Sequence, residues 1–329
     1  MAVSQQKLKT LYVMQILLEK TDENHMLSAQ GIIDLLQMQH GMTADRKSIY
    51  SDIELLKEFG MDIVQQKGTN PGYYVGSRDF ELAELKMLVD AVQSSKFITQ
   101  KKSTELIDKL KKQTNEEYGK QLQRQVHILN RVKADNETVF YNVDAIHNAI
   151  SSNKQIQFKY TDWSPEGKLV FRKDGAFYNL SPWALTWDDE YYYLIGYDAK
   201  HKASVKYRVD KMRQVEVTSE SRLGKELFEN FDLADFSKKT FGMFDGNDER
   251  VTFSCKNYMV GVAIDRFGKD ITFIKDDEEN VHFSTTVSIS QQFFGWLTGV
   301  GLGIKIVKPQ KVKDEYKDHL NKVLNGYEL

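Results

Sequence analysis

The spacing of the apolar residues changes along this chain, and that change most constrains what the chain can fold into. In residues 5–59, leucine, isoleucine and valine recur about every three to four positions, which is the period of a helix with one buried face. In residues 155–217, apolar and polar residues alternate between frequent turns, a pattern typical of short strands. The two patterns predict a mixed α+β protein, and 329 residues are enough for two or three domains.

The N-terminal pattern predicts three helices followed by a β-hairpin. Leu27-Ser28 is expected to begin the second helix, which ends at Gly41, and Thr43 is expected to cap the third. The third helix, residues 44–59, buries one face and exposes polar and basic side chains near its start: Arg46, Lys47, Ser48, Tyr50 and Ser51. Lys67 follows in the hairpin turn. This order is the layout of a winged helix-turn-helix, whose exposed helix start reads the major groove of DNA. The alternative is an ordinary solvated helix surface.

Charge is unevenly distributed, although the net charge of the whole chain is only −2. Residues 1–75 hold seven basic and nine acidic residues, and this negative balance weighs against strong attraction to DNA phosphates. Residues 96–133 hold ten basic and four acidic residues, a net charge of +6. That stretch is either the solvated face of a helix or a basic linker that lies near a polyanion.

The third predicted helix resembles a known DNA-reading element. Residues 46–56 read RKSIYSDIELL, which is similar to the R-T-I-x-R-D-I-x-x-L pattern of the DeoR-like recognition helix. Ser51 stands where that pattern has its second basic residue. The resemblance therefore implies a DNA-binding helix that lacks one phosphate or base contact.

A second resemblance covers the aromatic strands. Residues 190–198, EYYYLIGYD, and residues 207–212, YRVDKM, resemble the two strand motifs of the WYL domain. Tyr192 replaces the tryptophan of that motif, Tyr193 and Leu194 match it, and Arg208 falls on the arginine of the second strand. The last 80 or so residues are similar to the C-terminal extension that follows many WYL domains. The resemblance implies a bacterial transcriptional regulator that dimerises, with an Sm/SH3-like small β-barrel that senses a nucleotide, a nucleic acid or another anionic effector.

The same resemblance implies a set of ligand-binding residues. Tyr193 and Arg208 lie on the motifs, whereas strand position suggests three more: Tyr160, Arg172 and Lys206. Arginine offers a planar fork to phosphate or carboxylate, and tyrosine stacks on bases. Two structural alternatives stand beside this interpretation. Asp210 could neutralise Arg208, and barrel strands must bury one face, which we expect to account for three tyrosines: Tyr191, Tyr192 and Tyr197.

These patterns predict a multi-domain α+β protein with four parts. We expect a winged helix-turn-helix in residues 1–78, a linker of long helices in 79–140, the WYL β-barrel in 141–220, and a connector with a C-terminal α/β extension in 221–329. The extension should run β–α–β–β–α–β–α, with one strand at residues 271–274, and it should serve dimerisation or regulation.

The sequence offers no catalytic or metal-ligating constellation. The seven histidines are scattered, and the single cysteine, Cys255, excludes an internal disulfide or a thiolate zinc site. The glycine run at 299–303 follows a predicted helix rather than a strand, so it is expected to end that helix and not to cradle a phosphate. The N-terminus is polar and no apolar run is long enough to span a membrane. We therefore expect a cytoplasmic protein without enzymatic activity, cofactor or metal.

The expected partners are a double-stranded DNA operator, an anionic or nucleotide-like effector and a second copy of the chain. The alternative function is a nucleic-acid or nucleotide-sensing module without operator specificity.

Overall fold

The computed structural model describes residues 5–68, 71–124, 133, 136–229, 232–244 and 246–327. The chain divides into two compact units, Met1–Glu137 and Thr138–Leu329, each of which combines smaller cores. The chain is thus a mixed α+β protein, as the apolar spacing predicts.

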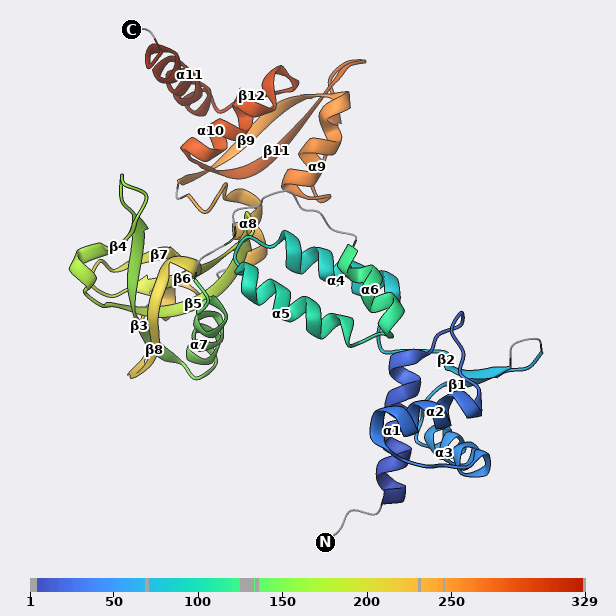
Figure 1. Cartoon of the computed structure of the whole chain (residues 1–329). Coiled ribbons are helices and arrows are strands. Elements are labelled where there is room, and N and C mark those ends of the chain that lie inside the picture. The colour runs from blue at the N-terminus through green and yellow to red at the C-terminus, as the bar shows by residue number, and fades with distance from the viewer. Residues whose placement is uncertain are drawn as a thin grey trace. The chain divides into compact units, whose positions relative to one another are not determined.

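The first unit begins with three helices and a hairpin (Figure 1), here called the head, residues 5–75. Its elements are α1 (Gln5–Lys20), α2 (Ala29–His40), α3 (Arg46–Glu58), β1 (Ile63–Gln66) and β2 (Gly72–Val75). One apolar core joins all five elements, through buried residues such as Leu17, Ile32 and Ile53. Ser28 caps α2 and Gly41 ends it with a left-handed φ of 64°, both as predicted.

The cap of α3 differs from the prediction. Asp45, and not Thr43, precedes the first helical residue, and its carboxylate accepts a hydrogen bond from the backbone N–H of Ser48 at 3.0 Å. An ionised carboxylate at this position also complements the helix dipole, which explains why aspartate takes the cap although a threonine stands two residues earlier.

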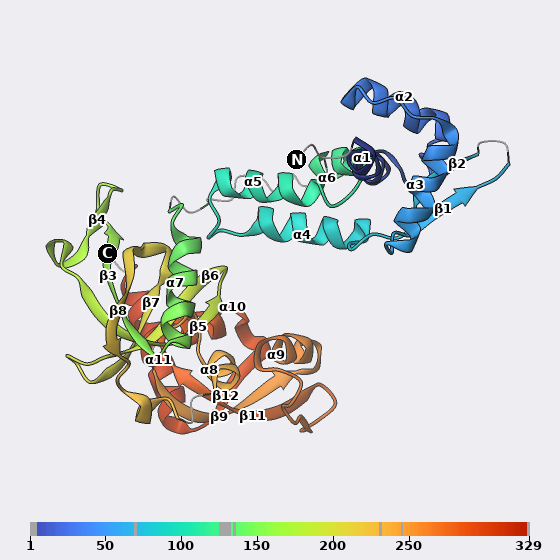
Figure 2. The same ribbon diagram turned by 90° about the horizontal axis from the view of Figure 1, so that it is seen from below.

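The rest of the first unit is helical, but its helices are short rather than long. They are α4 (Leu82–Ser94), α5 (Gln100–Lys111) and α6 (Glu116–Arg124), and Figure 2 shows α4 and α5 side by side. Thr99 caps α5 and Asn115 binds the first turn of α6, so each side chain favours a new helix start where longer helices were expected. Leu85, Val89 and Ile107 form the core of this three-helix segment.

The second unit opens with a helix and a curled six-stranded sheet that forms a half-barrel. Its elements are α7 (Val139–Ser151), β3 (Lys154–Trp163), β4 (Leu169–Phe171), β5 (Tyr178–Asp188), β6 (Tyr191–Asp198), β7 (Ala203–Arg208) and β8 (Met212–Ser221). The strands run in the order β4-β3-β5-β6-β7, and β8 pairs with β3. Among the described residues no pairing joins β7 to β8, so the sheet is a half-barrel where the sequence predicts a barrel.

A second sheet, with helices on one face, completes the chain. The elements are α8 (Leu233–Lys239), β9 (Asn247–Lys256), α9 (Val260–Phe267), β10 (Ile274–Lys275), β11 (Asn280–Ile289), α10 (Gln291–Gly299), β12 (Ile304–Lys308) and α11 (Gln310–Asn325). The strand order is β10-β11-β9-β12, with antiparallel neighbours, which is a split β–α–β arrangement. The predicted element order is confirmed from β9 onward, but the strand expected at residues 271–274 was placed wrongly: β10 covers only Ile274–Lys275. Phe253, Phe283 and Phe293 fill its core.

Candidate functional site

The start of α3 presents the side chains that the sequence singled out. Arg46, Lys47 and Ser51 are exposed, and the side chain of Tyr50 is 45% exposed. Ser48 is only partly exposed, and its hydroxyl donates to the carbonyl of Asp45 at 2.9 Å. Four of the five predicted side chains are therefore accessible to a ligand, whereas Ser48 helps to build the helix start.

Arg46 also contacts the neighbouring helix, and the sixth predicted residue, Lys67, lies in the hairpin. Arg46 Nη2 donates to Gln30 Oε1 of α2 at 3.4 Å, which ties the two helices of the helix-turn-helix order together. Lys67 is exposed directly after β1. Residues 69 and 70, at the predicted tip of the hairpin, lie outside the described residues.

A buried charge pair positions α3, and it was not predicted from the sequence. Asp52, on the inner face of α3, is 2% exposed and accepts a hydrogen bond from Thr10 Oγ1 of α1 at 2.7 Å. Lys9 Nζ lies 2.8 Å from the second carboxylate oxygen, and Lys9 is also buried, so the contact is a buried ion pair. The one feature of the sequence that pointed to this pair was Lys9 itself, a charged residue inside the apolar stripe of α1.

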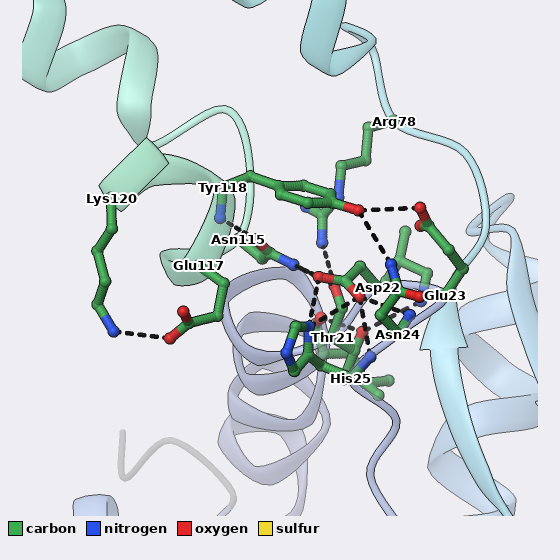
Figure 3. Close-up of polar contacts among 12 residues, drawn as sticks. Thr21, Asp22, Glu23, Asn24, His25, Arg78, Asn115, Glu117, Tyr118 and Lys120 are labelled. Carbon is green, nitrogen blue, oxygen red and sulfur yellow. Dashed lines mark hydrogen bonds and ion pairs between the residues drawn. The ribbon is translucent and has the colours of Figure 1, made fainter. Parts of the chain in front are cut away.

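A polar network joins the head to the three-helix segment (Figure 3). Asn115 uses both ends of its amide: its Oδ1 accepts from the backbone N–H of Tyr118 at 2.8 Å, and its Nδ2 donates to the Thr21 carbonyl at 3.2 Å and to the Asp22 carboxylate. Arg78 donates to the same Thr21 carbonyl at 2.9 Å. The loop between α1 and α2 is thus held by α6 and by the segment that enters α4.

Asp22 is the centre of this network, and its titration is coupled to His25. Burial works to raise the pKa of Asp22, but hydrogen bonds from His25, from the backbone N–H of Asn24 and from Asn115 outweigh it, so that pKa is lowered. The hydrogen bond to Asp22, at 3.0 Å, raises the pKa of His25. The pair is therefore ionised over a wider pH range than either group alone.

The basic stretch between residues 96 and 133 is partly neutralised where it is described. Four of its lysines form ion pairs with nearby carboxylates: Lys101 with Glu137, Lys102 with Glu105, Lys111 with Asp108 and Lys120 with Glu117. Lys133 donates to Ser103 Oγ at 2.6 Å, and burial lowers its pKa. Residues 125–132 of the predicted linker lie outside the described residues.

One face of the half-barrel carries a cluster of aromatic rings beneath two cations. Phe158, Tyr160, Tyr178 and Tyr207 pack at ring centroid distances of 5.0–6.4 Å. Arg172 lies 5.6 Å above the Tyr160 ring, and Lys173 lies 4.3 Å above the Tyr178 ring. Burial raises the pKa of Tyr207 to about 12, so its hydroxyl stays protonated at neutral pH. We call this group of six residues the aromatic cup.

The two cations stand on a strained turn. Lys173 and Asp174 adopt left-handed φ angles of 50° and 51°, which non-glycine residues rarely do. Such strain costs about 1–3 kcal/mol per residue and often accompanies a binding function. Arg172 also forms an ion pair with Asp162, with 3.4 Å between Nε and Oδ2. The sequence did not predict three residues of the aromatic cup as ligand-binding residues: Lys173, Tyr178 and Tyr207. The pattern that could have indicated them is the Lys-Asp-Gly turn between aromatic strands.

The remaining predicted ligand residues lie on the opposite face of the sheet. Side chains alternate along β7, so Lys206 and Arg208 point away from Tyr207, and Tyr193 is the register partner of Arg208. Arg208 binds Asp210 through two hydrogen bonds, at 2.8 and 3.1 Å, and lies 3.6 Å above the Tyr191 ring. Of the predicted five, Tyr160 and Arg172 therefore share the aromatic cup, and the other three do not.

Several side chains on these strands differ from their expected surroundings. Burial works to lower the pKa of Arg208, but Asp210 outweighs it and raises that pKa, so the alternative partner named from the sequence is the one present. Lys206 lies 4.7 Å above the Phe236 ring of α8. The three tyrosines that were expected in the core, Tyr191, Tyr192 and Tyr197, are only partly buried; Phe158 and Tyr160 are buried instead.

Comparisons with known proteins identify the half-barrel segment. Residues 141–217 match the family model described as the WYL domain, and this range covers nearly all of α7 to β8. Among solved structures, the chain is similar to proteasome accessory factor B/C (PafBC) of Arthrobacter aurescens, with 14% identity and a TM-score of 0.27 over 98% of this chain and 49% of that one. A CRISPR Cas-related protein shares 14% identity and a TM-score of 0.35, over 100% of this chain and 87% of that one.

The chain thus spans about half the length of the PafBC protein. Both TM-scores are below 0.5, so neither likeness informs the fold of this chain. No curated protein matches the sequence. Within the described ranges, no helix is long and apolar enough to cross a membrane, and no three His, Cys, Asp or Glu side chains are grouped as metal ligands would be.

Proposed function

We propose that this chain is a DNA-binding transcriptional regulator whose WYL domain senses an anionic, nucleotide-like effector. The observation that carries the proposal is the WYL match of residues 141–217 on a chain whose head has the element order of a winged helix-turn-helix. In this function the head reads DNA, and the aromatic cup binds the effector.

The exposed start of α3 supports the DNA-binding part. Arg46 and Lys47 supply cations and Tyr50 and Ser51 supply hydroxyls, on a helix that the buried Asp52 holds against α1. Short polar and basic side chains at a helix start suit phosphates and base edges of the major groove. The head has little positive charge, so we expect its affinity to depend on two copies that bind a two-fold operator.

The aromatic cup supports the sensing part. Arg172 and Lys173 provide two cations for phosphate or carboxylate, and the partly buried Tyr178 and Tyr207 provide ring faces for a base, whereas the buried Tyr160 packs against Arg172. Arg208 already has Asp210 as its partner, so in this proposal it organises β7 rather than binding the effector directly.

DNA binding is tested by selection from genomic fragments with the full chain, followed by titration of the enriched sequence. Arg46→Ala with Lys47→Ala should weaken specific binding by about 1–3 kcal/mol for each side chain that reads a base, and it should lower the salt dependence for each side chain that neutralises a phosphate. Lys305→Ala with Lys313→Ala removes the same charge from the second unit and is the matched control. No enriched sequence at any salt concentration, with or without nucleotides, would refute DNA binding.

Effector binding is tested by titrating the full chain with nucleotides and short single-stranded oligonucleotides. Arg172→Gln should weaken binding by about tenfold or more, because one charge-assisted hydrogen bond is worth about 1.5–3 kcal/mol. Lys168→Gln, an exposed lysine of the same β3–β4 hairpin, is the control. Equal effects of both variants would refute a specific cup site.

The second candidate is a nucleic-acid or nucleotide-sensing module without operator specificity. The acidic balance of the head and the cation-bearing cup favour it, because the cup could bind a polyanion without the head. Binding of single strands that is unchanged by the Arg46→Ala, Lys47→Ala pair, with no sequence enriched from genomic DNA, would favour this function over the first.

Three further features belong to the proposal. The regulator acts in the bacterial cytoplasm, where its DNA is; it is a homodimer; and it catalyses no reaction. A monomer mass by light scattering at micromolar concentration would contradict the homodimer, and turnover of any tested nucleotide by the purified chain would contradict the absence of catalysis.

A further inference from the structure

A separate cavity of about 500 Å³ lies in the C-terminal sheet region, outside the segment that matches the WYL domain. Its walls come from α8, from the segment between α9 and β10, and from β9 and β11. Small-ligand sites usually measure about 300–1,000 Å³, so the cavity is large enough for a small molecule. We call this cavity the β11 notch.

The lining of the β11 notch favours an anion. Four basic side chains line it, Lys238, Lys239, Arg250 and His282, against one acidic side chain, Asp270. Hydroxyl groups from β11 and from the segment before β10 supply further donors: Thr272, Ser284, Thr285 and Thr286. Cations and hydroxyls together are the donors that bind phosphate groups in proteins.

The backbone of β11 adds donors at the same place. The N–H of Asp276 donates to the carbonyl of Asn280, and Ile274 is the register partner of His282, so even-numbered residues of β11 direct their backbone groups towards β10. β10 begins only at Ile274, and in the described part of the chain no strand pairs with residues 283–289 on that side. The N–H groups of Ser284 and Thr286 therefore point to an open sheet edge, a place where proteins form anion-binding concavities.

The cations of the notch differ in how firmly they are held. Lys238 pairs with Asp270 at 3.0 Å and Lys239 with Asp248 at 2.7 Å, and His282 binds Asp276. These pairs are at least partly exposed, and exposed pairs contribute only about 0–1 kcal/mol, so a phosphate can replace the carboxylates at small cost. Arg250 is exposed and has no carboxylate partner among the described residues.

We propose that the β11 notch is a binding site for a small phosphorylated anion. Arg250 is its main anchor, because it is the unpaired cation; Lys238, Lys239 and His282 provide additional charge, and the N–H groups of Ser284 and Thr286 orient the phosphate. The site is distinct from the aromatic cup and does not depend on the function proposed for the cup or the head.

The test is isothermal titration of the full chain with inorganic pyrophosphate, with inorganic phosphate and citrate in parallel and ionic strength held constant with sodium chloride. We expect saturable binding of one pyrophosphate per chain, weaker binding of phosphate, and no comparable binding of citrate. Arg250→Gln should weaken pyrophosphate binding by about tenfold or more, whereas Arg250→Lys should retain most of it. Hydrogen exchange should show slower exchange in residues 270–288 when pyrophosphate is bound.

Two control variants make the result decisive. Lys305→Gln removes a cation from β12, on the same open face of the sheet but at its other edge, and it should leave binding unchanged. Arg172→Gln removes a cation of the aromatic cup and so separates binding there from binding at the notch: the loss caused by Arg250→Gln should be the same with and without it. No binding at constant ionic strength, equal loss in Arg250→Gln and Lys305→Gln, or loss only in Arg172→Gln would each overturn the site.

Discussion

Replacing Asn115 by alanine removes two different interactions at once, and their contributions can be separated. The side chain is 1% exposed; its Oδ1 binds the first turn of α6, and its Nδ2 donates to the Thr21 carbonyl and the Asp22 carboxylate. Loss of a helix N-cap costs about 1 kcal/mol. A buried acceptor left without its donor costs about 1–3 kcal/mol. Asn115→Ala should therefore destabilise the first unit by about 2–4 kcal/mol.

A second variant, Asn115→Ser, separates the two contributions to the free energy of unfolding. Asn115→Ser retains a capping oxygen but has no amide to reach Asp22, so it should lose only about 1–3 kcal/mol. Hydrogen exchange of the full chain measures both variants, because α6 and residues 21–25 should exchange faster in proportion to the loss. All four tryptophans lie in the second unit, at positions 163, 183, 187 and 296, so their fluorescence should not change. Equal losses in the two variants, or faster exchange in the second unit alone, would refute the reasoning.

Three other outcomes follow from buried or titrating groups. The hydrogen bond to Asp22 raises the pKa of His25, so the protonated histidine stabilises the folded state. This stabilisation is complete below the unfolded pKa of about 6.5 and is lost as pH rises through the folded pKa. Hydrogen exchange of the α1–α2 loop, corrected for intrinsic rates, should therefore accelerate with pH in the native chain and not in His25→Gln. Asp52→Ala leaves Lys9 buried without its partner and should cost about 3–5 kcal/mol in the exchange-derived stability of the head; an effect below about 1 kcal/mol would contradict the buried pair. Phe253→Ala empties the core of the C-terminal sheet and should cost about 3–5 kcal/mol by denaturant titration of tryptophan fluorescence, whereas Tyr258→Ala, at an exposed site, should change little.

Local chemistry made much of the head predictable. Ser28 and Gly41 bound α2 because a serine hydroxyl and a left-handed glycine satisfy helix ends wherever they occur. The exposed residues of α3 were predictable from helical spacing, because that spacing decides which side of a helix faces outward. The cap of α3 was predicted wrongly: Thr43 was expected there, whereas Asp45 precedes the first helical residue in the structure.

The candidate ligand site was less predictable, because strands bring distant residues together. Alternation places Lys206 and Arg208 on one face of β7, but only the pairing of β3, β5, β6 and β7 shows that Tyr160 and Tyr207 share the other face. The sequence offered both an anionic ligand and Asp210 as partners for Arg208. The hydrogen bonds of Arg208 show that Asp210 binds it in this structure.

The sequence by itself determined the order of helices and strands in the head and from β9 onward, the exposed face of α3 and the aromatic strands of the segment that matches the WYL domain, because each depends on spacing and caps within a few residues. Only the tertiary structure decided which side chains meet. Asn115 reaches Asp22 across 93 positions, Lys9 reaches Asp52 from another helix, and the β11 notch needs an edge that β10 is too short to cover. Such contacts depend on how distant helices and strands pack and pair, and no local sequence pattern predicts that packing.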